Sequence, residues 1–441
     1  MPRSPGSPTA GDAAARELLT LAAPRVQPGL TRVRELLRAF DDPQSGLRAV
    51  HIAGTNGKGS VAAMLTSILC AAGLRAGCYT SPHLVDVRER IRVDGRCVDE
   101  APLRRLAQTL KATALAMRER PSYFEMMTAL ALAYFADVGV DVAVVEAGMG
   151  GRFDATNVVD PLVCAITNIA TDHTDYLGSA PEEIAWEKAG IAKRGVPVVV
   201  GEQIRGEPLE VISREVARCG ARLVASRADT ARHLGGDWTG SSFRVTASSY
   251  TGHVRLALPG RFQTTNVGVA LTVVDALREQ GIDVPSEAVA LGLSHARWPG
   301  RLETVREAPR VVLDGAHNVA GARALVEALD DLGPPASRRR LLLGVLGDKD
   351  AAGMLRILLP AFAHATMTAS RSPRAMAAPR LAEIARGVGV EVGVADTVRD
   401  GLQSVVGGSA DDELVTVAGS LTVVGEARAY LVGGPCDDEA A

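Results

Sequence analysis

The glycine-rich segment GTNGKGS, Gly54 to Ser60, restricts the fold of this chain more than any other feature. An apolar run with the length of a short buried strand, Arg48 to Ala53, precedes it. A helical pattern from Gly57 to Ala72 follows. In such a strand, loop and helix unit, backbone N–H groups and the helix dipole hold phosphate. The segment therefore predicts a phosphate-binding loop in an α/β fold.

Three types of residue support this interpretation. Glycines let the backbone approach phosphate, Lys58 supplies a positive charge, and Ser60 stands at the helix start near a possible Mg²⁺. The spacing departs from the Walker A motif, because only Thr55 and Asn56 separate Gly54 from Gly57 and because Gly59 precedes Ser60. The alternative is a glycine-rich structural turn, which the lysine, the hydroxyl and the flanking elements disfavour.

Helix and strand patterns alternate after this unit. Repeated alternation predicts a mostly parallel sheet with helices on both faces. The predicted helices are Glu17 to Phe40, Glu125 to Phe135 and Glu182 to Lys193, and the further strands are Val142 to Glu146, Leu162 to Thr167 and Val196 to Val200. Short alternating runs between Ala221 and Leu258 predict an antiparallel excursion.

A second α/β series follows Trp298 to Gly300, where Pro and Gly indicate a hinge. Its predicted strands are Val311 to Asp314, Leu341 to Val345 and Leu414 to Val417. We expect a phosphate-loop domain and a smaller Rossmann-like α/β domain. The predicted boundaries are a disordered tail at 1–16, the two domains at 17–296 and 297–432, and an acidic tail at 433–441.

Composition excludes several classes of protein. With 48 basic and 51 acidic residues, the 441-residue chain has a formal net charge of −3, so it lacks the basic footprint of a dedicated nucleic-acid binder. No apolar run approaches the roughly 18 to 20 residues of a membrane helix, and the N-terminus lacks the apolar core of a secretion signal. The six cysteines contain no C-x-x-C pair, which favours reduced thiols. We expect a soluble, cytoplasmic protein.

Other candidate residues follow the predicted strands. Glu146 ends one strand and His173 follows the next, where open α/β sheets place their ligands. With the Ser81 hydroxyl these groups form an oxygen-rich set suited to Mg²⁺. Taken singly, a strand-end Glu or a loop His is more often a structural hydrogen-bonding group. Proximity to the phosphate loop favours the metal interpretation.

Several longer motifs resemble one family. GTNGKGS resembles the Mur ligase superfamily, and the segments TSPHL (from Thr80), VEAGMGGRFDATN (from Val145) and DHTDYLG (from Asp172) resemble its folylpolyglutamate synthase/dihydrofolate synthase branch. The likeness continues through EKAGIAK (from Glu187), WPGRLE (from Trp298) and DGAHN (from Asp314), and spans residues 30 to 426. One departure is Val319, where the family often has Pro after DGAHN.

The resemblance implies a set of catalytic and nucleotide-binding residues. It gives Lys58, Glu146, His173 and Lys188 the catalytic roles, with metal ligation by Ser81, Glu146, His173 and Lys188. Lys188 is implied to be carbamylated, which converts a cation into an oxygen ligand for a second Mg²⁺. The implied ATP contacts are Asn56, Gly57, Lys58, Gly59, Ser60, Asn266, Arg301, Asp314 and His317.

The same resemblance places the pterin of the substrate near Arg32, Tyr123, Phe124, Glu125, Arg152 and Asp154. Phe124 would stack on the flat heterocycle, and Arg152 would pair with a carboxylate or a pterin acceptor atom. In the competing interpretation, Ser122 and Glu125 form a capping box that turns Tyr123 and Phe124 into the core. A second predicted capping box, Ser179 with Glu182, begins the helix that carries Lys188.

The implied reaction is ATP-dependent ligation of L-glutamate to dihydropteroate, to a reduced folate, or to both, through an acyl phosphate. Closure at Trp298 to Arg301 would exclude water from that intermediate. The alternatives are a cell-wall ligase, a phosphate-loop kinase and a nucleotide-gated binding module. A monomer is expected from the resemblance.

Overall fold

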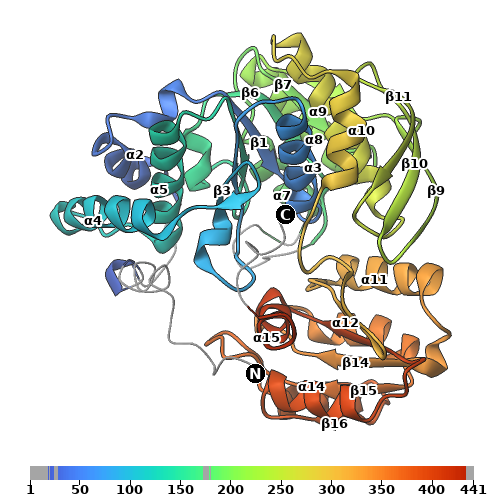
Figure 1. The fold of residues 1–441 in the computed structure, drawn as a ribbon. Coiled ribbons are helices and arrows are strands. Elements are labelled where there is room, and N and C mark those ends of the chain that lie inside the picture. The colour runs from blue at the N-terminus through green and yellow to red at the C-terminus, as the bar shows by residue number, and fades with distance from the viewer. Residues whose placement is uncertain (1–17, 19, 24–27, 172–177, 179, 434–441) are drawn as a thin grey trace.

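The larger part of the protein is an eight-stranded sheet with the strand order β4-β3-β2-β5-β1-β6-β7-β8 (Figure 1). The computed structural model describes residues 18, 20–23, 28–171, 178 and 180–433. Strands β2, β5, β1, β6, β7 and β8 run parallel, while β3 and β4 add in antiparallel fashion at one edge. The bounds are β1 Ala49–Ala53, β2 Ala76–Tyr79, β3 Ile91–Val93, β4 Arg96–Cys97, β5 Val142–Glu146, β6 Pro161–Ile166, β7 Pro197–Val200 and β8 Arg222–Ala225.

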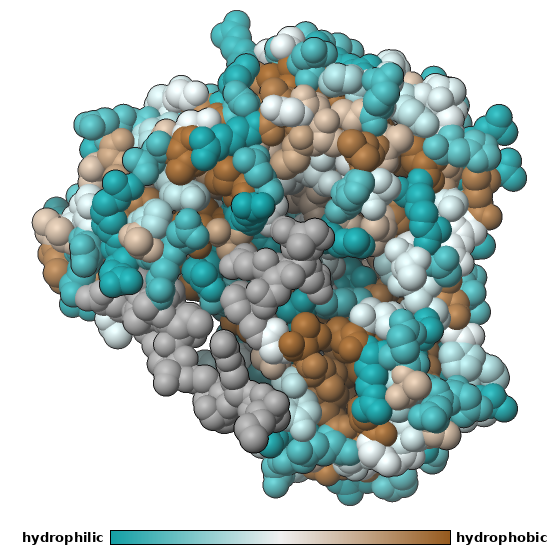
Figure 2. Space-filling view, viewed as in Figure 1, coloured by the Kyte–Doolittle hydropathy of each residue, from teal (hydrophilic) through white to brown (hydrophobic). Residues whose placement is uncertain are grey.

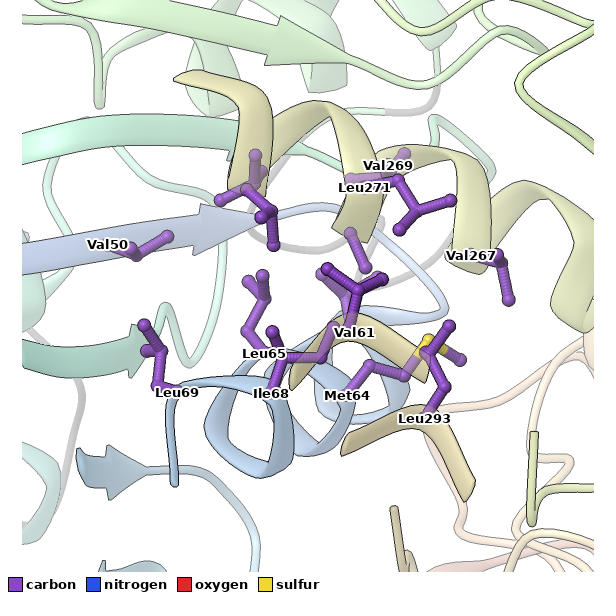
Figure 3. Close-up of a cluster of buried hydrophobic side chains, with 14 of the residues drawn as sticks. Val50, Val61, Met64, Leu65, Ile68, Leu69, Val267, Val269, Leu271 and Leu293 are labelled. Carbon is purple, nitrogen blue, oxygen red and sulfur yellow. The ribbon is translucent and has the colours of Figure 1, made fainter. Parts of the chain in front are cut away.

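Helices cover both faces of this sheet, and its central strands β1 and β5 are therefore buried along their whole length. One face packs on α3 Lys58–Ala71, α9 Gln263–Glu279 and α10 Ser286–His295, which form the apolar cluster in Figure 3. The other face packs on α2 Thr31–Arg38, α4 Glu100–Ala116, α5 Tyr123–Val138, α7 Pro181–Ala189 and α8 Glu207–Cys219.

The helix starts test two predicted capping boxes. Ser122 and Glu125 form one at the start of α5, since each side chain accepts the backbone N–H of the other. At α7 the N-cap is Ala180 and not the predicted Ser179, which lies outside the described residues, and Glu183 in place of Glu182 accepts the Ala180 N–H. Pro181 suits the first helical position because it has no N–H to satisfy there.

An antiparallel sheet of β9 Ala231–Asp237, β10 Gly240–Thr246 and β11 Thr251–Leu256 confirms the predicted excursion. The excursion begins later than predicted, because β8 still pairs in parallel with β7. Alternate residues Phe243 and Val245 join the core against α9.

The smaller part is a six-stranded sheet with the order β12-β13-β17-β14-β15-β16, in which all pairs except β12 with β13 are parallel. Its helices pack on both faces, in line with the predicted fold class. The strands are β12 Glu303–Glu307, β13 Arg310–Leu313, β14 Arg339–Leu343, β15 His364–Met367, β16 Gly393–Val394 and β17 Leu414–Ala418. The helices are α11 Val319–Leu332, α12 Ala351–Leu358, α13 Ala378–Gly387, α14 Val398–Gly407 and α15 Leu421–Leu431.

Short 3₁₀ turns complete the described chain: η1 Pro43–Gly46, η2 Val87–Arg90, η3 Ala155–Val158, η4 Ala336–Arg338 and η5 Leu359–Ala361. Among the described residues, none of the helices is both long and apolar enough to cross a membrane. Figure 1 shows the second sheet and its helices as a separate body below the first. The predicted domain boundary at 296/297 lies between α10 and β12.

Candidate functional site

A cavity of about 640 Å³ lies between the two sheets, and Figure 2 shows the molecule hollowed there. It is lined by residues that lie within two positions of the carboxyl ends of strands in both sheets. From the first sheet come Gly54 after β1, Ser81 after β2 and Asn168 after β6. From the second come Asp314 after β13 and Ser420 after β17. Both sheets thus present their carboxyl edges to one space, the position where open α/β sheets bind ligands.

The phosphate loop is held in shape by its neighbours. The Asn168 side-chain oxygen accepts the backbone N–H groups of Thr55 at 3.1 Å and Asn56 at 2.7 Å. The Thr167 hydroxyl donates to the Asn56 carbonyl at 2.6 Å. Helix α3 then begins at Lys58, with Gly57 in the left-handed conformation as its N-cap. The first N–H groups of α3 are therefore aimed at the cavity, as an anion site requires.

Two glycines of this loop are required by close approach. A Cβ on Gly57 would lie 2.3 Å from the side-chain oxygen of Asn266, and a Cβ on Gly59 would lie 2.6 Å from the ring of Trp298. The predicted site residue Asn266 therefore lies directly over the loop. Trp298, the first residue of the predicted hinge, lies against the loop as well.

Lys58 and Glu146 meet beside the loop. The Lys58 Nζ atom donates to the carbonyls of Gly54 at 2.9 Å and Thr55 at 3.2 Å and lies 3.9 Å from Glu146 Oε1. The Ser81 backbone N–H donates to Glu146 Oε2 at 3.3 Å. Burial raises the pKa of the Glu146 carboxyl, and Lys58 opposes this only in part. A buried carboxylate beside a phosphate loop is a natural ligand for a cation.

Of the remaining predicted metal ligands, the structure describes only Lys188. Lys188 is buried in α7 and lines the cavity, but His173 lies outside the described residues. Within the described part of the chain, no group of three or more His, Cys, Asp or Glu side chains is arranged to hold a metal ion.

The predicted residues of the second sheet surround one carboxylate. Asp314 accepts the N–H groups of Leu302 at 3.0 Å and Ala316 at 2.9 Å, and burial raises its pKa. Arg301 donates to the Gly300 carbonyl at 3.0 Å, and His317 Nδ1 lies 2.8 Å from the Gly315 carbonyl. Arg301, Asp314 and His317 all line the cavity opposite the phosphate loop.

Among the predicted substrate residues, Phe124, Glu125 and Asp154 line the cavity. Glu125 also caps α5, so the capping interpretation is correct for this residue, whereas Phe124 both lines the cavity and packs against the neighbouring apolar cluster. A Cβ on Gly148 would lie 2.5 Å from that ring, which shows how closely the opposite loop approaches it.

The structure does not bring Arg32, Tyr123 and Arg152 to the cavity lining. Arg32 Nε pairs with Glu125 at 3.1 Å behind the wall, and Tyr123 packs in the adjoining apolar cluster. Arg152 lies 3.9 Å from the centre of the Trp186 ring and pairs with Glu215. Each of these three side chains thus contacts other parts of the protein and does not line the cavity.

Sequence reasoning missed several lining residues. Phe153 is 47% exposed and lines the same wall as Phe124. Lys349 and Arg374 line the second-sheet side, and Arg374 pairs with Asp348 at 2.8 Å. Asn168 and Lys349 lie shortly after predicted strands, so the rule that identified Glu146 would have found them too.

Comparisons with known proteins match this architecture. The Mur ligase middle domain matches residues 52–274, and the Mur ligase glutamate ligase domain matches residues 300–421. The chain is 36% identical to the dihydrofolate synthase/folylpolyglutamate synthase of Bacillus subtilis, covering 92% of this chain and 95% of the relative. It is 39% identical to a probable bifunctional folylpolyglutamate synthase/dihydropteroate synthase of Haloferax volcanii, but spans only 48% of that longer protein.

Solved structures agree with the sequence matches. Folylpolyglutamate synthase of Mycobacterium tuberculosis, complexed with ADP and AMPPCP, has a TM-score of 0.88 at 34% identity and covers 97% of this chain and 100% of its own. Escherichia coli FolC in complex with DHPP and ADP has a TM-score of 0.84 at 31% identity, covering 96% and 99%.

A phosphate-loop domain that faces a second α/β sheet across one cavity, matched by both Mur ligase domains, defines a Mur-type ligase. Within this class, the chain belongs to the folylpolyglutamate synthase/dihydrofolate synthase family.

Proposed function

We propose that this protein is an ATP-dependent carboxylate–amine ligase that adds L-glutamate to dihydropteroate, to reduced folate glutamates, or to both. The observation that carries the proposal is the single cavity bordered by the phosphate loop, Glu146 and the carboxyl edge of the second sheet. Such a space can hold a nucleotide and two further reactants together. The names of the similar proteins support the same reaction.

ATP is the proposed nucleotide. Its phosphates would lie on the N–H groups at the start of α3, with Asn56, Gly57, Gly59 and Ser60 around them and Lys58 as the counter-charge. The nucleoside would reach Asn266, which lies over the loop, and Arg301, Asp314 and His317, which line the opposite side. Two of the similar structures contain an ATP analogue or ADP.

A divalent cation, with Mg²⁺ as the proposed ion, would be held by Glu146, Ser81 and the family residue His173. Glu146 and Ser81 suit it because they supply oxygen atoms beside the phosphate loop. When bound, such an ion neutralises charge on the transferred phosphoryl group. A similar structure from Yersinia pestis contains AMPPNP and Mn.

A carbamylated Lys188, ligating a second ion, is a separate part of the proposal. Lys188 is buried at the cavity, where its amine would add CO₂ in the uncharged form. The test is ¹³C NMR of the protein in ¹³C-bicarbonate, with Lys188→Gln as the control. A carbamate signal missing only in the variant supports the adduct, and identical spectra would reject it.

The acceptor is proposed to lie against Phe124, Phe153 and Asp154. Aromatic faces at a cavity wall suit a flat heterocycle, and a carboxylate there accepts N–H groups of a pterin. Of the other family positions, Glu125 lines the cavity, whereas Arg32, Tyr123 and Arg152 would act only from behind the wall.

Glutamate is proposed to bind on the second-sheet side. Lys349 and Arg374 supply positive charge for its two carboxylates. One similar structure contains L-glutamate with AMPPNP and Mn. In this arrangement the amine of glutamate faces the acceptor across the same cavity, so the binding sites position both reactants.

The reaction consists of two displacements. An oxygen of the acceptor carboxylate attacks the γ-phosphorus, the bond to the ADP oxygen breaks, and an acyl phosphate forms. The glutamate amine then attacks the acyl carbon, phosphate leaves with the former carboxylate oxygen, and the amine loses a proton. Lys58 offsets charge in the first step, and closure of the two bodies around the cavity would keep water from the acyl phosphate.

The test of this route is isotope transfer from an acceptor labelled with ¹⁸O in its carboxylate. One labelled oxygen should appear in each phosphate released, and release should require glutamate. Unlabelled phosphate would reject the acyl phosphate, while a phosphorylated product formed without glutamate would favour a kinase. We also propose, on the family resemblance, that the enzyme is monomeric and cytoplasmic.

A further inference from the structure

A buried hydrogen-bonded chain runs from β1 to the cavity wall behind Asp154. His51 Nε2 lies 2.8 Å from the Thr156 hydroxyl, and that hydroxyl lies 2.5 Å from Asp154 Oδ1. His51 and Thr156 are fully buried, whereas Asp154 lines the cavity. The chain connects the strand that leads into the phosphate loop with the proposed acceptor site.

Asp154 is surrounded by N–H donors. Its Oδ1 accepts the Thr156 N–H at 3.0 Å, and its Oδ2 accepts the Met149 N–H at 2.9 Å. Because a backbone N–H can only donate, these contacts favour the carboxylate over the neutral acid. Burial has the opposite effect and raises the pKa of Asp154. The direction of the Thr156 hydroxyl hydrogen therefore matters. If the hydroxyl donates to Asp154 it stabilises the carboxylate, and if it points away its oxygen repels the carboxylate oxygen.

The tautomer of His51 decides which way that hydroxyl points. If Nε2 carries the proton, it donates to Thr156 Oγ1, and the Thr156 hydrogen is directed to Asp154. If Nε2 is bare, the Thr156 hydrogen points to His51, and two oxygen lone pairs face each other unless Asp154 is protonated. The charge of Asp154 is thus linked to the tautomer of a histidine outside the cavity.

His51 is suited to a fixed, neutral role. Burial, with a smaller effect from Lys193, lowers its pKa to about 3. Its Nδ1 has no hydrogen-bond partner among the described residues, so a bare nitrogen there leaves no buried N–H without an acceptor. Both observations favour the neutral ring with its proton on Nε2.

We propose that His51 and Thr156 are positioning residues that hold Asp154 as a carboxylate facing the acceptor heterocycle. This inference rests on the proposed function, because it takes the pterin as the group that Asp154 meets. Neither residue touches the reactants. They act through the direction of one hydroxyl hydrogen.

The binding experiment compares Thr156→Val, which removes the hydroxyl, with Thr156→Ser, which keeps it. Thr156→Val should weaken dihydropteroate binding, measured by calorimetry, at least about tenfold, since a hydrogen bond to a charged group is lost. Thr156→Ser should stay within about twofold, and ATP binding should be unchanged in both variants. Equal loss of ATP and dihydropteroate binding, or unchanged dihydropteroate binding in Thr156→Val, would overturn the proposal.

The spectroscopic experiment is ¹⁵N NMR of the histidine rings in the full chain, with the His51 signals assigned by their loss in His51→Leu. A protonated Nε2 and a bare Nδ1 are expected, and the opposite tautomer would overturn the proposal. Measuring ligation by the wild-type protein distinguishes failure of the proposed function from failure of the proposed role of His51. Absence of ligation rejects the proposed function, whereas ligation with the wrong tautomer rejects only the role of His51.

Discussion

Asn56 of the phosphate loop and Asn318 at the start of α11 exchange hydrogen bonds through their side-chain amides, although 262 residues separate them. Asn318 Nδ2 donates to Asn56 Oδ1 at 3.0 Å, and Asn56 Nδ2 donates back at 3.4 Å. Asn318 Oδ1 also accepts the Gly321 N–H at 2.8 Å and so caps α11. One side chain therefore joins the phosphate loop to the second sheet's body.

This bridge should matter for turnover more than for stability. Asn318→Ser keeps an N-cap oxygen but is too short to reach Asn56, so we expect ligation to slow several-fold with little change in thermal unfolding. Asn318→Ala also removes the cap and should cost about 1 kcal/mol of stability. Steady-state rates and melting curves of both variants check this. Full activity of Asn318→Ser would contradict a role for the bridge.

Gly57→Ala should damage nucleotide binding. The new Cβ would lie 2.3 Å from Asn266, at a φ of +82° that L residues rarely adopt. The matched control is Gly73→Ala, with a φ of +79° and open space around the Cβ. Both changes carry a backbone cost of about 1–2 kcal/mol, but only Gly57→Ala should weaken ATP binding, by at least about tenfold. Calorimetry with ATP measures the difference, and equal affinity in the two variants would be inconsistent with the described loop.

Glu146→Gln should separate stability from activity. Because burial raises the pKa of Glu146 above its ordinary 4.5, the folded chain keeps a proton that the unfolded chain has already lost. The contribution of this group to stability is therefore present below pH 4.5 and is lost as pH rises through the raised folded value.

Without metal at neutral pH, Glu146→Gln should then unfold at a higher temperature than the wild type, and the two should converge in acid. In the variant the Lys58 ammonium keeps its hydrogen bonds to the Gly54 and Thr55 carbonyls, so the change does not leave it without a partner. Ligation should fall at least about 100-fold, as for loss of one preorganised charge contact. A variant that is less stable at neutral pH would show that Glu146 is stabilised as a carboxylate in the absence of metal.

Arg152→Met tests whether this arginine contacts the acceptor. Since Arg152 pairs with Glu215 and stacks on Trp186, we expect a stability loss of about 1 kcal/mol and an acceptor KM within about twofold of the wild type. Glu215→Gln should lower stability similarly. A tenfold rise in KM at unchanged stability would instead place Arg152 at the substrate.

Sequence reasoning succeeded where a local pattern determines local structure. The strand, glycine loop and helix at residues 49–71 follow from apolar runs and glycine positions, and Glu146 was located by its place at a strand end. The sequence pattern places the start of α7 one residue too early, because Glu182 and Glu183 both suit the third helical position, and Pro181 as the first helical residue favours Glu183.

The relationships that no local pattern contains are those between distant segments. Asn318 looks like an ordinary helix cap in the sequence, and its contact with Asn56 depends on how the two bodies meet. Arg152 lies in a glycine-rich motif beside Asp154, yet its side chain turns to α7 and α8. His51 reads as one more residue of a buried strand, because its partner Thr156 is 105 residues away.

The most direct test of the central claim is the mass of the product formed from ATP, Mg²⁺ and L-glutamate, with dihydropteroate and a reduced monoglutamyl folate offered separately. At least one acceptor should gain one glutamyl unit for each phosphate released, and gain on both would establish a bifunctional ligase. Nucleotide binding with no glutamyl gain on either acceptor would show that the protein is not a glutamate ligase of folates.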